Sequence, residues 1–343
     1  MESSTSSTKR KDNDDDDDDE IIFDNSPLFR LYKSGRMERL GEVPPIPPSL
    51  DPKTRVKTND IKIISSKTRD HIIPVRLFKP NIPKNKRIPL LVYFHGGGFC
   101  IESTFSPKYH NYLNKLASEA QVMIFSVEYR LIPEHPLPAA YHDCWDALKW
   151  VVFKARDEEE WIQEHVDFDR VYLMGDSAGG NIAHRMALLA ELDGDGGGVG
   201  SVCCISGVIL VHPYFWGKQR IGDEAAKCSR IPNPDLATKV WALACPESGS
   251  GVDDPWINPG NDPDLWRLGC KRVLVCVAEK DFLRDRGLYY KEALEKSGWQ
   301  GTIEVVESKG VDHVFHLLRP FSANSLQLMA KVVAFLNPTR STL

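Results

Sequence analysis

The sequence lacks any long uninterrupted apolar stretch, and no hydrophobic run approaches the roughly 20 residues that a membrane-spanning helix needs. Its beginning, MESSTSSTKRKDNDDDDDDE, has no apolar core, so we expect no secretory signal peptide there. The only Asn-x-Ser/Thr triplet, at residues 337–339, has proline at its centre and cannot accept a glycan. These absences favour a protein of the cytoplasm, with the nucleus as the alternative, and no membrane partner.

Excess basic charge and metal-type cysteine spacings are absent as well. The chain has 43 Lys and Arg against 48 Asp and Glu, a net charge of −5, and much of the acidity lies in residues 14–20. This balance provides no basic surface for nucleic acid. The eight cysteines form no Cys-x-x-Cys pair, and several lie inside apolar segments, where a reduced thiol acts as a small hydrophobe. We therefore expect no metal site and no disulfide framework.

What the sequence does contain is a regular alternation of apolar and helical segments. Strand-like runs occupy residues 90–94, 122–127, 171–174, 208–211, 273–277 and 303–306. Helical patterns occupy residues 109–120, 142–154, 178–192, 287–297 and 322–336. Two earlier segments, 56–64 and 72–78, alternate apolar and polar residues and predict an antiparallel hairpin. The order predicts an α/β fold with a mostly parallel sheet flanked by helices.

The same pass along the chain predicts its domain organisation. Residues 1–24 are polar and then acidic, which predicts a disordered tail, and residues 25–343 read as a single α/β domain. Between 214 and 268 no clear strand pattern occurs, although the segment holds four tryptophans. Because ligands bind at the carboxyl ends of parallel strands, a helical insertion there would roof the site. We expect cap segments at about 25–50 and 214–268.

The stretch Gly-Asp-Ser-Ala-Gly-Gly at 175–180 joins an apolar run to a helical one. A strand that turns abruptly into a helix needs small residues around its tip, and the spacing G-x-S-x-G defines a nucleophile elbow. Ser177 is then an exposed nucleophile, and the helix beginning at Ala178 directs its amides at charge developing there. An ordinary glycine-rich turn is the alternative, so the choice depends on partners for Ser177.

A serine nucleophile needs a base, and the base needs an orienting acid, in the chain order serine, acid, histidine. Asp281 follows the run 273–277, and His313 comes in the loop after the last strand. His316 is the rival base. The histidines at 184 and 212 are more simply structural, and Asp285 is more simply a helix N-terminal cap.

Tyr-Phe-His-Gly-Gly-Gly-Phe at 93–99 follows the strand-like run 90–94. Glycine amides in such a loop can approach a substrate oxygen, so we assign an oxyanion hole to the backbone N–H groups of Gly97, Gly98 and Ala178. A phosphate-binding loop is the alternative, but neither Lys-Ser/Thr nor G-x-G-x-x-G follows.

Together these motifs resemble the hormone-sensitive-lipase branch of the α/β-hydrolases. The segments YRLIPEHPLPAA (129–140), DCWDALKW (143–150), DPWINP (254–259) and DFLRDRG (281–287) are similar to plant carboxylesterases, the group related to the gibberellin receptor and the 2-hydroxyisoflavanone dehydratases. The resemblance implies an α/β-hydrolase fold with a cap built from the N-terminal arm and the inserted segment. It also favours His313, in a D-H-x-F setting, over His316.

The motifs and the resemblance together predict a serine carboxylesterase that acts on a small-molecule ester, and its triad mechanism needs no cofactor. The cap tryptophans and Phe99 beside the oxyanion loop favour an apolar or aromatic substrate. Two alternatives keep the same pocket: a dehydratase- or cyclase-type lyase of plant specialised metabolism, and a hormone-binding receptor-like protein. Receptors of the family replace the catalytic histidine, and many dehydratases carry threonine at the nucleophile position, whereas Ser177 and His313 are present here. Oligomeric state has no signal in the sequence.

Overall fold

The computed structural model describes residues 19–41, 43–66, 71–193, 199–202 and 204–338. The chain forms two compact units, Met1–Gly41 and Glu42–Leu343.

The first unit contains a small antiparallel sheet of three strands, β1 (Ile21–Asn25), β2 (Phe29–Tyr32) and β3 (Met37–Arg39). The rings of Phe23 and Phe29 meet edge to face, with centroids 5.5 Å apart. Strands this short carry too few alternating positions for a sequence pattern, so they were not expected. Of the predicted acidic tail, residues 1–24, residues 1–18 lie outside the described part, and β1 begins at Ile21.

The second unit is built on an eight-stranded sheet in the order β11-β10-β9-β8-β6-β7-β5-β4. Its strands are β4 (Lys57–Ile64), β5 (Ile72–Lys79), β6 (Ile88–Phe94), β7 (Met123–Val127), β8 (Val166–Asp176), β9 (Ile205–Val211), β10 (Arg272–Ala278) and β11 (Thr302–Ser308). The pairs β4–β5 and β5–β7 are antiparallel and the others are parallel. The predicted hairpin and the mostly parallel sheet are both confirmed.

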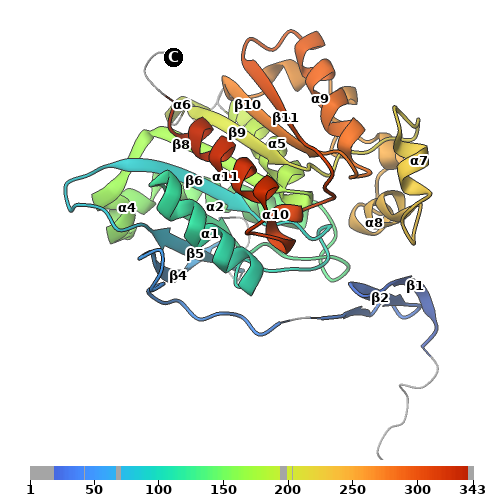
Figure 1. Cartoon of the computed structure of the whole chain (residues 1–343), viewed down its shortest axis with the longest axis horizontal. Helices are drawn as coiled ribbons and strands as arrows, with labels where there is room; N and C mark the ends of the chain where they lie inside the picture. The colour runs from blue at the N-terminus through green and yellow to red at the C-terminus, as the bar shows by residue number, and fades with distance from the viewer. Residues whose placement is uncertain (1–18, 42, 67–70, 194–198, 203, 339–343) are drawn as a thin grey trace, which may run out of the picture. The chain divides into compact units, whose positions relative to one another are not determined.

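Helices cover both faces of this sheet. They are α1 (Pro107–Ala120), α2 (Ala139–Phe153), α3 (Ala155–Glu158), α4 (Glu160–His165), α5 (Ala178–Leu192), α6 (Val199–Val202), α9 (Arg284–Lys296), α10 (Phe315–Leu318) and α11 (Ala323–Leu336). In Figure 1 α1, α10 and α11 lie in front of the sheet, and α2 and α5 lie behind it. Alternate strand residues such as Leu91 and Tyr93 join α1 and α11 in one buried cluster. Successive side chains of a strand point to opposite faces of the sheet. Because helices cover both faces, the central strands are apolar on both.

The parallel order places four strand ends side by side. Ser177 follows the last residue of β8, and His212 follows the last residue of β9. Asp281 comes three residues after β10, and His313 comes in the loop between β11 and α10. Because β8, β9, β10 and β11 are neighbours and run in one direction, these residues share the carboxyl edge of the sheet.

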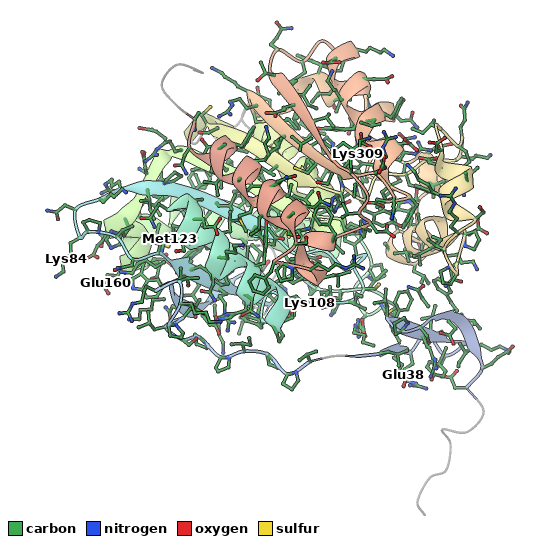
Figure 2. The ribbon with its side chains drawn as sticks, in the orientation of Figure 1. Glu38, Lys84, Lys108, Met123, Glu160 and Lys309 are labelled. Atoms are coloured by element: carbon green, nitrogen blue, oxygen red, sulfur yellow. The ribbon has the colours of Figure 1, made fainter. Side chains whose placement is uncertain are left out.

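Residues 214–268 contain helices rather than strands. These are α7 (Glu224–Cys228), α8 (Leu236–Ala244) and the 3₁₀ turns η2 (Gly251–Asp253), η3 (Pro259–Asn261) and η4 (Leu265–Arg267). Charged side chains such as Lys84 and Glu160 are exposed and lie at the periphery of the second unit (Figure 2). Over the described ranges, no helix is both long enough and apolar enough to cross a bilayer.

Candidate active site

The turn from β8 into α5 holds Ser177 in a backbone conformation that L-residues rarely adopt. Its φ and ψ are 52° and −119°. Two backbone hydrogen bonds fix it, from Ser177 N–H to the Val211 carbonyl and from Tyr214 N–H to the Ser177 carbonyl, both at 2.9 Å. A Cβ on Gly179 would lie 2.0 Å from the Phe94 carbonyl oxygen, so the helix could not begin this close to β6 with a larger residue. The local geometry is that of the predicted elbow, but Ser177 is buried rather than exposed, with 8% of its surface accessible.

Ser177, His313 and Asp281 form one hydrogen-bonded chain. The hydroxyl Oγ of Ser177 lies 3.0 Å from Nε2 of His313, and Nδ1 of His313 lies 2.7 Å from Oδ2 of Asp281. The other carboxylate oxygen of Asp281 accepts the Leu283 N–H at 2.9 Å. With Nδ1 protonated, Nε2 is left as the acceptor of the serine proton. The three residues come from β8, β10 and β11, 136 and 32 positions apart along the chain.

Burial and charge shift the pKa values of His313 and Asp281 in opposite directions. Burial alone would lower the pKa of His313, but the charge and hydrogen bond of Asp281 outweigh it, so the pKa of His313 lies above its usual value. Burial alone would raise the pKa of Asp281, whose side chain is fully buried, yet His313 holds that pKa below its usual range. The acid therefore stays ionised, and the imidazole is a stronger base than one in water.

The loop after β6 places the predicted oxyanion donors in a tight turn. Gly97 has φ +106°, and a Cβ there would lie 2.1 Å from the carbonyl oxygen of Ile101, so only glycine fits. The carbonyl of Gly97 accepts the N–H groups of Cys100 and Ile101, both at 3.0 Å. Among the described residues, none accepts a hydrogen bond from the amide of Gly97, Gly98 or Ala178.

A buried carboxylate that the sequence analysis did not single out supports this loop. Asp176 accepts hydrogen bonds from the hydroxyls of Tyr93 at 2.7 Å and Tyr109 at 2.9 Å. The Tyr109 oxygen in turn accepts the Gly96 N–H at 2.8 Å. Burial raises the pKa of Asp176 above its usual range. The sequence did offer a signal for this role, an acidic residue within an elbow made of small residues. A carboxyl group buried at that position needs hydrogen-bond partners.

The remaining histidines near the elbow have other neighbours. His184, on α5, contacts the Tyr290 hydroxyl through Nδ1 at 3.0 Å, and burial lowers its pKa to about 3. His316, the rival base, lies on α10 and is buried against Tyr112, with ring centroids 5.1 Å apart. His212 accepts the Val314 N–H through Nδ1 at 3.0 Å. The Ser177 hydroxyl is hydrogen-bonded to His313, not to any of these three.

One group of described side chains has the spacing of a metal site, His212 with Asp281 and His313, whose ligand atoms lie within 4.8 Å of one another. Both ring nitrogens of His313 already take part in hydrogen bonds to Ser177 and Asp281. Nδ1 of His212 accepts a backbone N–H, and a backbone amide occupies the second oxygen of Asp281. A metal ion would have to displace these bonds, so the donor set fits the hydrogen-bonded chain better.

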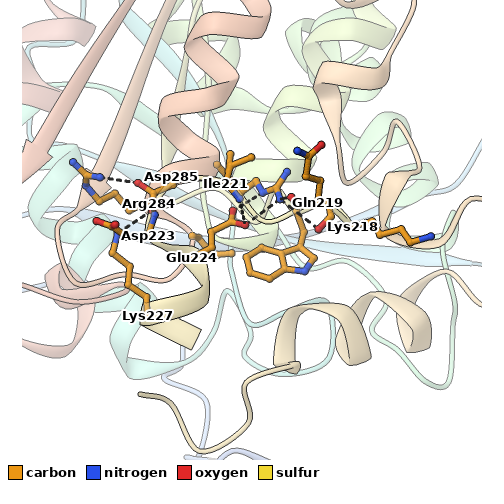
Figure 3. Close-up of polar contacts among 12 residues, drawn as sticks. Lys218, Gln219, Ile221, Asp223, Glu224, Lys227, Arg284 and Asp285 are labelled. Carbon is orange, nitrogen blue, oxygen red and sulfur yellow. Dashed lines mark hydrogen bonds and ion pairs between the residues drawn. The ribbon is translucent and has the colours of Figure 1, made fainter. Parts of the chain in front are cut away.

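Charged side chains tie α7 to the beginning of α9 (Figure 3). Glu224 is fully buried and accepts Nε of Arg286 at 2.5 Å and Nη2 at 3.1 Å. Asp285 accepts the Asp223 N–H at 3.0 Å and Nζ of Lys227 at 3.2 Å. The prediction of Asp285 as a helix cap was wrong, because α9 begins one residue earlier and this carboxylate binds α7 instead. The inserted segment is thus bonded to the helix that follows the predicted acid.

Comparison with known proteins identifies the family to which this fold belongs. The chain belongs to the alpha/beta hydrolase fold family, whose model matches residues 91–317. It is a carboxylesterase-family enzyme of the plant type, 44% identical to probable carboxylesterase 7 of Arabidopsis thaliana over 92% of this chain and 98% of the relative. It is also 42% identical to 2-hydroxyisoflavanone dehydratase of Glycyrrhiza echinata, covering 92% and 96% of the two chains.

A solved esterase of Pyrobaculum calidifontis superposes with a TM-score of 0.66 at 28% identity, covering 82% of this chain and 84% of that one. The predicted fold class, family and enzyme class are confirmed. The residue roles and the substrate remain predictions.

Proposed function

We propose that the protein is a serine carboxylesterase that hydrolyses a small-molecule carboxylic ester through an acyl-enzyme on Ser177. The observation that carries this proposal is the hydrogen-bonded chain from Ser177 through His313 to Asp281. Such a chain lets the imidazole take the serine proton as the hydroxyl oxygen attacks, while the carboxylate stabilises the imidazolium.

In this mechanism Ser177 Oγ bonds to the ester carbonyl carbon, and its proton passes to Nε2 of His313. The tetrahedral intermediate then collapses, and His313 returns the proton to the departing alcohol. Water, deprotonated by the same nitrogen, attacks the acyl-enzyme and releases the carboxylic acid and free Ser177. Every proton that leaves a nucleophile is delivered to a leaving group, so the reaction needs no cofactor.

The amides of Gly97, Gly98 and Ala178 are the proposed donors to the oxyanion. Each such donor typically lowers the barrier by about 3 kcal/mol, because it is oriented before the charge develops. The tight turn at Gly97, which only glycine can adopt, and the position of Ala178 at the start of α5 support this assignment. The helix dipole adds a favourable field at the same point.

The side chains around Ser177, His313 and Asp281 favour an apolar or aromatic substrate. Phe282 lies beside His313 with ring centroids 6.1 Å apart, and Trp216 meets Phe282 edge to face at 5.9 Å. Phe99 follows the proposed oxyanion loop and lies 6.2 Å from the Tyr214 ring. Aromatic rings of this kind pack well against flat or apolar groups.

The test is intact mass after incubation with a fluorophosphonate, together with hydrolysis of a short-chain p-nitrophenyl ester. The wild-type chain should gain one phosphonyl group and turn over the ester, and both results should vanish in Ser177→Ala and His313→Ala. Circular dichroism of the variants checks that the fold persists. Undiminished hydrolysis by Ser177→Ala would overturn the proposal.

The relative named as a dehydratase suggests one alternative function. In it the protein is a lyase that uses the same residues without forming an acyl-enzyme. The same experiment separates the two, because a lyase need not acylate its serine. A wild-type chain that neither labels nor hydrolyses esters would favour the lyase.

A further inference from the structure

One buried histidine at the carboxyl edge of the sheet has no part in the mechanism above. His212 directly follows β9, the strand between those that lead to Ser177 and Asp281. Its side chain is 1% exposed. Its backbone N–H donates to the Cys276 carbonyl at 2.8 Å, and its Nδ1 accepts the N–H of Val314 at 3.0 Å. His212 therefore bonds the residue directly after His313.

Val314 is an unusual residue for the conformation it adopts. Its φ and ψ are 44° and 31°, in the left-handed region that β-branched side chains avoid. Such a conformation is strained and persists only where surrounding bonds hold it. Its carbonyl accepts the Leu317 N–H at 3.0 Å, and its N–H donates to His212. The bond from the Val314 N–H to His212 connects the loop after β11 to the end of β9 in the sheet.

The bond to Val314 also defines the tautomer of His212. Since Nδ1 accepts, the ring proton lies on Nε2, and burial lowers the pKa of His212 well below its usual value, so the ring stays neutral. Among the described residues, Nε2 of His212, both ring nitrogens of His316 and the Tyr112 hydroxyl make no hydrogen bond. The two histidine rings lie 5.6 Å apart.

We propose that His212 is a positioning residue, which accepts the Val314 N–H through Nδ1 and thereby fixes the imidazole of His313 between Ser177 and Asp281. It touches no reacting atom. This role adds a positioning residue to the proposed hydrolysis. It depends on that proposed function in every experiment that measures activity. A loosened loop would leave the fold intact but misplace the base, and a misplacement of about 1 Å costs on the order of 100-fold in rate.

The matched variants are His212→Asn and His212→Leu, whose side chains have the same size and branching. Asparagine Oδ1 occupies the place of Nδ1 and can accept the Val314 N–H, whereas leucine cannot. We expect His212→Leu to lower kcat about 100-fold with little change in KM. His212→Asn should keep most of kcat. Equal kcat losses in the two variants would overturn the proposal, because the lost ring would then be the cause.

A second readout does not depend on turnover: the pKa of His313 measured by NMR titration of its ring protons. The ionisable groups around this ring are Asp281, Asp176, Asp312, His212 and His316. If the loop loosens, the hydrogen bond to Asp281 weakens, so His212→Leu should lower the pKa of His313 and His212→Asn should leave it near the wild-type value. A His313 pKa that is the same in both variants would overturn the positioning role.

The two readouts separate this inference from the proposed function. A wild-type chain without esterase activity would refute the function, while the difference in His313 pKa between the variants would still test the inference. If His212→Leu fails to fold, His212→Gln replaces it, since its amide is one bond further from the backbone and places no acceptor at the Nδ1 position.

Discussion

At the scale of single residues, the imidazole of His313 is the group on which the proposed chemistry depends most. It is partly buried, with a side-chain exposure of 24%, and shares a short hydrogen bond with a carboxylate that is fully buried. The raised pKa of His313 means that Asp281 favours the charged imidazolium more than burial disfavours it. An imidazolium stabilised in this way forms readily when Ser177 loses its proton.

The first prediction concerns pH. His313 must be neutral to accept a proton, so kcat/KM rises with pH as the imidazole deprotonates, and the raised pKa places this rise above the usual histidine range. Asp281→Asn removes the charge, so the rise should move to lower pH while kcat falls about 10⁴-fold. The pH profile of ester hydrolysis measures both effects. Asp312→Asn, which changes the more weakly acting neighbour, is the matched control and should shift the profile little.

The sequence predicts that Ser177, Asp281 and His313 lie together, as their hydrogen bonds show, because each comes after an apolar run and their chain order is informative. It does not report partners that become neighbours only in the folded chain. Asp176 lies next to Ser177 in sequence, yet its partners Tyr93 and Tyr109 are 83 and 67 positions away. His212 bonds a residue 102 positions later. No local pattern encodes such pairs.

At the scale of elements, α1 supports the glycine loop at residues 95–98 through the side chain of one tyrosine. The hydroxyl of Tyr109, near the start of α1, bonds both the loop amide of Gly96 and the carboxylate of Asp176, whereas Tyr93 bonds Asp176 only. The Gly96 amide of the loop is therefore held through α1, while the hydroxyl of Tyr129 donates to the His95 carbonyl at 2.7 Å.

We predict that Tyr109→Phe lowers kcat about 10-fold or more by releasing the loop that carries two of the proposed oxyanion donors, Gly97 and Gly98. Tyr93→Phe removes one hydrogen bond from the same carboxylate without touching the loop, and it should keep a higher kcat at a similar loss of stability. Steady-state kinetics with urea unfolding of each variant makes the comparison. Equal kcat values in the two would argue that Tyr109 contributes only to stability.

The ion pair between α7 and α9 leads to a stability prediction. Glu224 and Arg286 have side-chain exposures of 0% and 4%, and removing one partner of a buried pair typically costs about 3–5 kcal/mol. Glu224→Gln should lower the free energy of unfolding by about this amount, measured in urea. Glu292→Gln breaks an exposed pair with Lys296 on the same helix and should change little. Equal losses would mean that the buried pair contributes no more than the exposed one.

Elements were predictable where their pattern was long. The central strands are apolar on both faces, and the helices between them are amphipathic, so both appear in the sequence with boundaries a few residues off. The short strands β1, β2 and β3 were missed, because three to five residues give no usable period. The pairing of Glu224 with Arg286 was equally hidden, since 62 positions separate them.

At the scale of the whole molecule, the division into two units matters most. The eight-stranded sheet and the hydrophobic cluster against it lie entirely within the second unit. A unit with its own core is expected to fold by itself.

A chain that begins at residue 42 should therefore keep its secondary structure and a cooperative thermal transition. If residues 25–50 form part of the cap, this deletion should raise KM for the ester, and deletion of residues 1–18 alone should not. Circular dichroism and steady-state kinetics check both expectations. An unchanged KM would argue against the arm as a cap.

The sheet order has a practical consequence. Ser177, Asp281 and His313 follow three different strands, and β9 lies between the first two, so the hydrogen-bonded chain exists only when this half of the sheet has assembled. Secondary structure alone does not bring these residues together. Once phosphonylation of Ser177 is established, the fraction of chains that react in a preparation counts the correctly assembled molecules. The return of labelling after dilution from denaturant then follows the assembly of this half of the sheet.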